Sequence, residues 1–115
     1  MDATIDWNQL EAISDGFSPE FLEIFQELKS EVPKLLAQMD ASLKSKDLAQ
    51  VARLAHRLKG AVINFGFLGV AGLLEQLEAQ AKSENPEGIH DKLEQIEKSY
   101  SKGLTSLEEK IYAQT

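Results

Sequence analysis

Residues 19–43 read PEFLEIFQELKSEVPKLLAQMDASL, and their apolar side chains recur every three or four positions. This spacing places the apolar side chains on one face of a helix, so it predicts one long amphipathic α-helix. Ser18 before Pro19 suits an N-cap followed by proline at the first helical position. Pro33 should bend the helix, because proline cannot donate the internal backbone hydrogen bond. The apolar face would consist of Phe21, Leu22, Phe25, Leu28, Val32, Leu35, Leu36, Met39 and Leu43.

The same helical spacing recurs on both sides of this segment. Asp6 can cap a short helix before it, and Asp47, with Gln50 placed for a capping box, can begin the next helix. We therefore expect an all-α fold, an antiparallel four-helix bundle with a short extra N-terminal helix, forming a single domain over residues 1–115. The further helices are expected at about 6–13, 47–65, 70–83 and 89–111, with breaks at 14–16, 45–46 and 85–88.

The composition fits one soluble domain and excludes several kinds of chemistry. With 115 residues, of which 43% are hydrophobic, the chain can bury one core but not two. The formal net charge of −7 disfavours nucleic acid and anionic membrane surfaces as partners, since both attract basic proteins. The chain has no cysteine, which excludes disulfides, thiolate metal sites and cysteine nucleophiles. The sequence also lacks a Gly-x-Ser-x-Gly motif and a glycine-rich phosphate loop.

The N-terminal stretch bears on location. Residues 1–7 include Asp2 and Asp6 and lack the basic start and apolar run of a signal peptide. No apolar stretch approaches the roughly 20 residues that span a bilayer. We therefore expect a cytoplasmic location, and we expect the chain to act as a monomer.

The helix expected at 47–65, DLAQVARLAHRLKGAVINF, carries the most informative side chains. On a helical wheel His56 falls roughly 130° from the centre of the apolar stripe, so it should face solvent. Gly60 lies on the same outer face, one turn later. Lys59 lies at the edge of the stripe and can bring its long side chain around the helix. Arg53, Arg57 and Asn64 share the outer face.

Two features of this face are unusual for a merely solvated surface. A glycine inside a helix costs about 1 kcal/mol relative to alanine, so Gly60 suggests that something needs the space beside His56. Arg53, Arg57 and Lys59 would form a positive cluster that stabilises negative charge developing near the imidazole. An exposed imidazole is a competent nucleophile near neutral pH, and attack on phosphorus would give a phosphoramidate. From these residues alone, an ordinary solvated helix face explains the pattern equally well.

The segment AHRLKGA at 55–61, with Gly66 further on, resembles the motif of the histidine-containing phosphotransfer domain family, His-x-x-Lys-Gly among small or apolar residues. VPKLL at 32–36 in the proline-containing helix and LEQLE at 74–78 are also similar to the family pattern. The resemblance covers roughly residues 17–100 and is strongest over that range.

The resemblance implies a phosphorelay intermediate of a two-component system without kinase activity of its own. His56 would accept a phosphoryl group from the aspartyl phosphate of a response-regulator receiver domain and pass it to another receiver. Lys59 would offset phosphoryl charge, and Gly60 would let the receiver approach. The family often has a glutamine that orients the imidazole. The matching position here is Glu78, with Glu75 a weaker candidate.

The partners implied are receiver domains, including that of a hybrid histidine kinase. The receiver would supply Mg²⁺, and we expect no cofactor or metal site in this chain. An apolar patch rimmed by polar groups should surround the histidine. Candidate contacts are Arg53, Arg57, Ile63 and Asn64, with Ile5 or Leu10 of the N-terminal segment, although Leu10 is expected in the core.

Two other functions remain open on the sequence. A non-catalytic helical adaptor would bind a signalling partner through one face, and His56 would be incidental. A metal-binding bundle is the second alternative, because Glu87-Gly88-Ile89-His90 matches the Glu-x-x-His spacing of di-iron bundles once. This pair lies at a Pro/Gly loop, and at His56 the required glutamate is replaced by Arg53, which would repel a cation. His90 is therefore expected to be an ordinary surface residue.

Overall fold

The computed structural model describes residues 5–14 and 16–113, and the helices within them confirm the expected all-α fold. The elements are α1 (Trp7–Ser14), α2 (Pro19–Lys44), α3 (Leu48–Ile63), α4 (Leu68–Lys82) and α5 (Ile89–Ala113). The described residues form no strand beyond an isolated antiparallel bridge between Ile5 and Phe67. The expected break at 14–16 includes Asp15, which lies outside the described residues.

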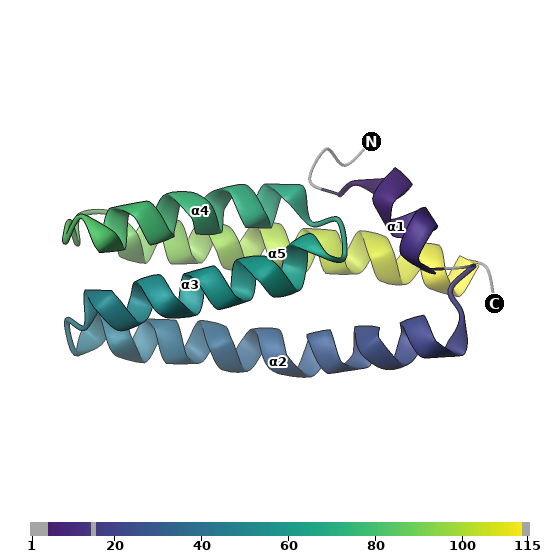
Figure 1. Cartoon of the computed structure of the whole chain (residues 1–115), viewed down its shortest axis with the longest axis horizontal. Helices are drawn as coiled ribbons and strands as arrows, with labels where there is room; N and C mark the ends of the chain where they lie inside the picture. The colour runs from purple at the N-terminus through teal and green to yellow at the C-terminus, as the bar shows by residue number, and fades with distance from the viewer. Residues whose placement is uncertain (1–4, 15, 114–115) are drawn as a thin grey trace.

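Helices α2 to α5 form an antiparallel bundle in which successive helices run in opposite directions (Figure 1). α3 packs against α2 and α4, and α5 packs against α4 and α2, so the four helices close a ring around the core. The short α1 lies at the end of the bundle where α3 connects to α4 (Figure 1). None of the described helices is long and apolar enough to cross a membrane.

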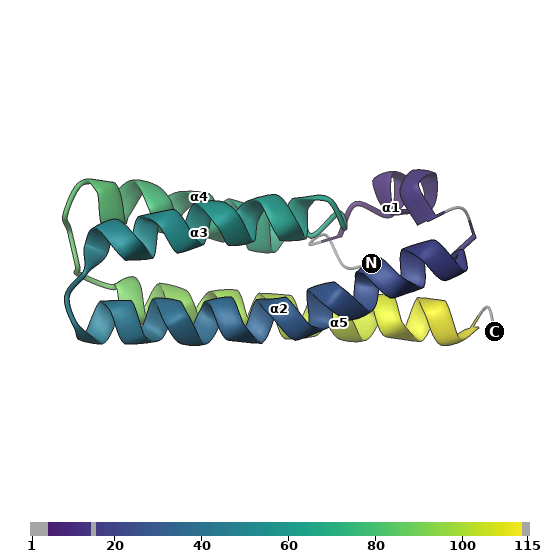
Figure 2. The same ribbon diagram turned by 60° about the horizontal axis from the view of Figure 1, so that its bottom comes forward.

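The long helix α2 runs without interruption through Pro33, as the continuous apolar stripe predicted. Its ribbon changes direction part-way along its length in Figure 2, in agreement with the expected bend. Ser18 caps the helix, and its hydroxyl oxygen accepts a hydrogen bond from the Phe21 backbone N–H at 3.2 Å.

Only one of the two hydrogen bonds of the expected capping box is present at the start of α3. The Asp47 carboxylate accepts a hydrogen bond from the Gln50 backbone N–H at 3.1 Å, as predicted. The reciprocal bond is absent, because the Asp47 N–H donates to the Ser42 carbonyl and the Gln50 side chain accepts from Arg53. α3 also ends at Ile63, two residues before the expected end, and a turn brings Phe65 into the core.

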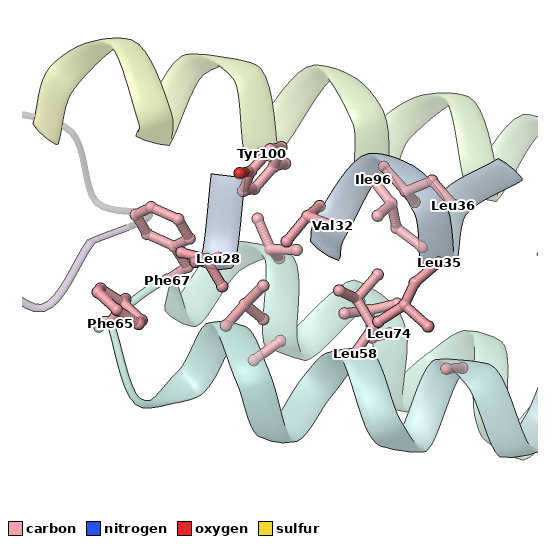
Figure 3. Packing of buried hydrophobic residues seen from close by; sticks show 14 of the residues in the cluster. Leu28, Val32, Leu35, Leu36, Leu58, Phe65, Phe67, Leu74, Ile96 and Tyr100 are labelled. Carbon is pink, nitrogen blue, oxygen red and sulfur yellow. The ribbon is translucent and has the colours of Figure 1, made fainter. Parts of the chain in front are cut away.

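The core takes residues from every described helix and from the α3–α4 connection. Figure 3 shows the part of it formed by α2 to α5 and this connection. Phe65, in the turn after α3, packs on Phe21 and Phe25 of α2 with ring centroids 5.5 and 6.2 Å away. Phe67 is fully buried and meets Tyr100 of α5 edge to face. The buried rings of Phe65 and Phe67 thus hold the α3–α4 connection against the core, which fixes the position of α3 relative to α4.

Ile5 and Leu10 are core residues. They are 5% and 2% exposed, respectively, which confirms the core role of Leu10. The suggestion that Ile5 contacts a partner is wrong: Ile5 bridges to Phe67 and its side chain packs near Gly103 of α5.

Tyr100 carries a buried hydroxyl that has no hydrogen-bond partner among the described residues. Burial raises the pKa of Tyr100 to about 12, and the charge of Glu108 adds to the effect. Tyr100→Phe should raise the free energy of unfolding by about 1 kcal/mol at neutral pH, since it removes an unsatisfied polar group. Urea denaturation of both proteins measures this difference, and a less stable variant would show that the hydroxyl has a partner.

The same group makes a pH-dependent contribution. Because the folded-state pKa of Tyr100 is raised, the neutral phenol favours the folded state, and its contribution to stability is complete below about pH 10. That contribution is lost as the pH rises from about 10 towards 12, because the unfolded chain ionises first. The loss of stability over this range should be smaller in Tyr100→Phe.

Candidate functional site

His56 lies in the middle of α3 and faces solvent, as the helical wheel predicted. Its side chain is 70% exposed, whereas Ala55 and Leu58 on either side are completely buried. Core packing therefore fixes the helix backbone at His56, while the imidazole ring stays accessible to solvent.

Glu78 of α4 holds one nitrogen of the exposed ring. The Nδ1 atom of His56 is 3.2 Å from Oε1 of Glu78. An ionised carboxylate can only accept a hydrogen bond, so Nδ1 must carry the proton. The lone pair of a neutral ring then resides on Nε2, the nitrogen that Glu78 does not bind. Of the two glutamates predicted as candidates for orienting the ring, Glu78 is the one in contact with it. Glu75 is exposed, and the hydrogen bond to the ring comes from Glu78.

Glu78 is itself unusual, because it is a charged residue in the core of the described structure, with 8% of its surface exposed. Its second oxygen, Oε2, accepts from the Nζ of Lys82 at 2.8 Å. The hydrogen bond from Lys82 lowers the pKa of Glu78, and the bond from His56 acts in the same direction against the opposing effect of burial. Glu78 is therefore ionised at neutral pH.

The expected positive cluster is less uniform than the sequence suggested. Arg53 donates to the side chain of Gln50, and Arg57 pairs with Glu31 of α2 at 2.9 Å. Lys59 is half-buried and forms no ion pair with any residue in 5–14 or 16–113. Of the three basic side chains on α3, only Arg57 is paired with an acidic side chain among the described residues; Arg53 is hydrogen-bonded to a neutral amide.

Gly60 lies in open space. A Cβ built at Gly60 would meet no other atom within 4 Å, so packing within this chain does not require glycine there. Ile63 and Asn64, one turn further, are exposed, as expected. Leu68 at the start of α4 is also exposed (45%), and sequence analysis did not single it out. The surface beyond Gly60 thus combines apolar and polar side chains.

A groove of about 510 Å³ runs beside His56 between α3 and α4. Ala49, Ala52 and Ala81 give it an apolar lining, and the small size of alanine creates the space. Its charged lining residues include Arg53, Glu78, Lys82 and Glu84. Sequence analysis missed Lys82, although its position four residues after Glu78 is the spacing of a helical ion pair.

The other histidine is not part of this site. His90 at the start of α5 is 66% exposed and pairs with Glu94 at 3.2 Å, which agrees with its expected place on the surface. Within residues 5–14 and 16–113, no three His, Asp or Glu side chains are grouped in a way that could hold a metal ion.

Comparisons with known proteins place this geometry in context. The sequence model of the Hpt domain matches residues 23–105. Among solved structures, the chain is similar to histidine-containing phosphotransfer protein B (HptB) from Pseudomonas aeruginosa, with a TM-score of 0.91 and 18% sequence identity over 98% of each chain. That likeness concerns the fold. Comparison of the sequence with curated proteins gives no match.

Proposed function

The chain belongs to the Hpt domain family, and from this premise we propose that His56 is the phospho-accepting histidine of a phosphorelay. One observation carries the proposal: the exposed imidazole of His56 is held at Nδ1 by Glu78, which leaves Nε2 free to attack. Family membership supports a histidine phosphotransfer role. The burial of Glu78 and its pairing with Lys82 support the choice of His56 over His90, whose partner Glu94 is exposed.

The transfer step requires no proton movement at the ring. The Nε2 lone pair attacks the phosphorus of an aspartyl phosphate on a receiver domain. The N–P bond forms as the P–O bond to the aspartyl carboxylate breaks, and the carboxylate leaves with the electron pair. The Nδ1 proton stays in place, so the phosphorylated ring is a cation, which the adjacent Glu78 carboxylate stabilises. In the reverse step the ring leaves as neutral imidazole.

Charge on the transferred group must be offset from both proteins. We assign Lys59 to this task, because it lies one turn after His56 on α3 and forms no ion pair within the described part of the chain. Mg²⁺ bound to the acidic pocket of the receiver would supply the remaining charge stabilisation.

The partners follow from the same chemistry. The donor is a receiver domain that carries an aspartyl phosphate, and the acceptor is a receiver domain whose aspartate is free. A hybrid histidine kinase is the proposed source of the donor. Exposed Ile63 and Asn64, with Arg53 and Arg57 at the rim, are proposed docking contacts. The chain acts as a phosphocarrier without kinase activity. We propose that residues 1–115 form a single domain.

The test is incubation with a receiver domain that carries a labelled aspartyl phosphate. We expect label on this chain that is lost in acid and retained in alkali, as for a phosphoramidate, and that maps to the peptide containing His56. Label on another residue, or binding of the receiver with no label transferred by any of a panel of receivers, would overturn the proposal. Binding without transfer is the result expected of a helical adaptor.

Lys59→Ala should slow transfer without affecting folding. Loss of one group that stabilises transition-state charge, such as an oxyanion-hole donor, reduces rates by roughly 100-fold or more in enzymes, and a half-exposed group should contribute less, about tenfold. Rapid-quench measurement of labelling at saturating receiver gives the rate constant. Lys98→Ala on α5 is the matched control, because Lys98 lies on a different helix of the bundle. Wild-type kinetics for Lys59→Ala would remove Lys59 from the site.

Gly60→Ala should change stability and transfer in opposite directions. Alanine is favoured over glycine inside a helix by about 1 kcal/mol, and the new methyl group meets nothing in this chain. The variant should therefore be more stable by thermal denaturation. It should nevertheless bind the receiver more weakly and be phosphorylated more slowly, because the methyl group occupies the space through which the receiver approaches. Faster or unchanged transfer would show that the receiver docks elsewhere.

A further inference from the structure

We propose that Lys82 is a positioning residue for phosphotransfer, which holds the Glu78 carboxylate and, through it, the imidazole of His56. The inference rests on the proposed role of His56. Its structural basis is a continuous chain of contacts, from Lys82 Nζ to Glu78 Oε2 at 2.8 Å and from Glu78 Oε1 to His56 Nδ1 at 3.2 Å.

Each oxygen of the Glu78 carboxylate has a separate partner. The Glu78 side chain is 11% exposed, so few water molecules can compete for these oxygens. With Oε2 held by Lys82, the carboxylate plane is fixed and Oε1 is directed at the ring. Without Lys82 the carboxylate could rotate about its terminal bond, which is a soft torsion, and Oε1 would lose its fixed direction.

Charge gives Lys82 a second task. A carboxylate beside the ring stabilises the imidazolium, but it also repels the phosphoryl group that arrives at Nε2. Lys82 offsets the negative charge of Glu78, so that the pair acts as a hydrogen-bond acceptor with little net charge. A neutral glutamine at this position, as in the family pattern that the sequence resembles, would need no such cation.

The surroundings favour this arrangement. Lys82 lies in the last turn of α4, where a cation is stabilised by the helix dipole. The hydrogen bond from Lys82 is the largest of the effects that lower the pKa of Glu78. The other charged groups in the groove are Arg53, which is engaged with Gln50, and Glu84, so Lys82 is the cation that contacts the carboxylate.

The experiment uses the full chain and the variants Lys82→Met and Lys82→Arg, each in wild-type and Glu78→Gln backgrounds. Two readouts are compared: the ¹⁵N chemical shifts of the His56 ring, which report its tautomer, and the rate of labelling by a phosphorylated receiver. Lys44→Met is the matched control, because Lys44 forms the same i,i+4 pair with Asp40 in the last turn of α2.

In the wild-type background, Lys82→Met should lower the population of the Nδ1–H tautomer and slow labelling about tenfold, the lower end of effects seen for partners that orient a ligand. Lys82→Arg should restore both. In the Glu78→Gln background, Lys82→Met should change labelling less than about twofold, because a neutral amide needs no counter-charge. Lys44→Met should leave both readouts unchanged.

Three outcomes would overturn the inference. The first is a Lys82→Met protein with wild-type tautomer and rate. The second is an equally large effect of Lys82→Met in the Glu78→Gln background, which would mean that Lys82 contacts the receiver or the phosphoryl group directly. The third is an equal effect of Lys44→Met, which would mean that the slower labelling comes from the change in the net charge of the protein and not from the contact between Lys82 and Glu78. If no protein is labelled, the proposed function fails, while the tautomer readout still tests whether Lys82 positions the ring.

Discussion

Replacement of His56 by glutamine is expected to abolish phosphoryl acceptance while leaving the fold unchanged. The amide nitrogen of glutamine has no available lone pair, so it cannot attack phosphorus. The His56 side chain is 70% exposed, and glutamine is at least as good a helix former as histidine. The hydrogen bond to Glu78 is the one contact at risk, so the free energy of unfolding should change by no more than about 1 kcal/mol.

The measurement combines labelling by a phosphorylated receiver with circular dichroism and thermal denaturation. His90→Gln is the matched control, because His90 is also an exposed helical histidine paired with a carboxylate, Glu94. It should be labelled as well as the wild-type chain. Labelling of His56→Gln above background, or a loss that occurs only in His90→Gln, would contradict the assignment of the acceptor.

The fold was largely predictable from the sequence, because its determinants are local. The apolar periodicity of residues 19–43 marked α2, and the caps at Ser18 and Asp47 are sequence signals with a direct structural meaning. The capping box failed at Gln50 because Arg53, one turn later, takes its side-chain oxygen. Local patterns name the residues that can interact, but competition among neighbours decides which interaction forms.

The site was less predictable, because it depends on contacts between helices. The exposure of His56 follows from the wheel of α3 alone. The choice between Glu75 and Glu78 depends on how α4 is rotated against α3, which no pattern within either helix specifies. The burial of Glu78 also gives Lys82 a significance that its sequence position does not show. An ion pair between two exposed side chains contributes little, whereas a pair that holds a mostly buried carboxylate beside a nucleophile can affect reactivity.

That rotation of α4 against α3 depends on the connection between them, and Gly66 is its most constrained residue. Gly66 has φ +75°, and a Cβ at this position would lie 2.7 Å from the carbonyl oxygen of Asp6. The Gly66 carbonyl accepts from the Asp6 N–H at 2.6 Å and from the Leu68 N–H at 2.9 Å. Any side chain at Gly66 must therefore strain the turn and displace the N-terminal segment.

Gly66→Ala should be the most destabilising of the substitutions considered. The left-handed conformation costs alanine about 1 kcal/mol or more, and loss of the bond to Asp6 adds about 1 kcal/mol. Displacing Asp6 also lifts the neighbouring Ile5 from Phe67, so a total near 3 kcal/mol is expected. For a domain of this size that corresponds to a fall of roughly 10 °C in Tm.

Two other glycines separate the causes of this loss. Gly88→Ala introduces the same left-handed strain at φ +77° with no atom within 4 Å, so it should cost only the conformational part, about 1 kcal/mol. Gly72→Ala lies inside α4 in open space and should stabilise the protein by up to about 1 kcal/mol. If Gly66→Ala costs no more than Gly88→Ala in chemical denaturation, the contact with Asp6 contributes nothing. A larger loss, with faster amide exchange in α1, would show that the close approach of Gly66 to Asp6 holds the N-terminal segment on the bundle.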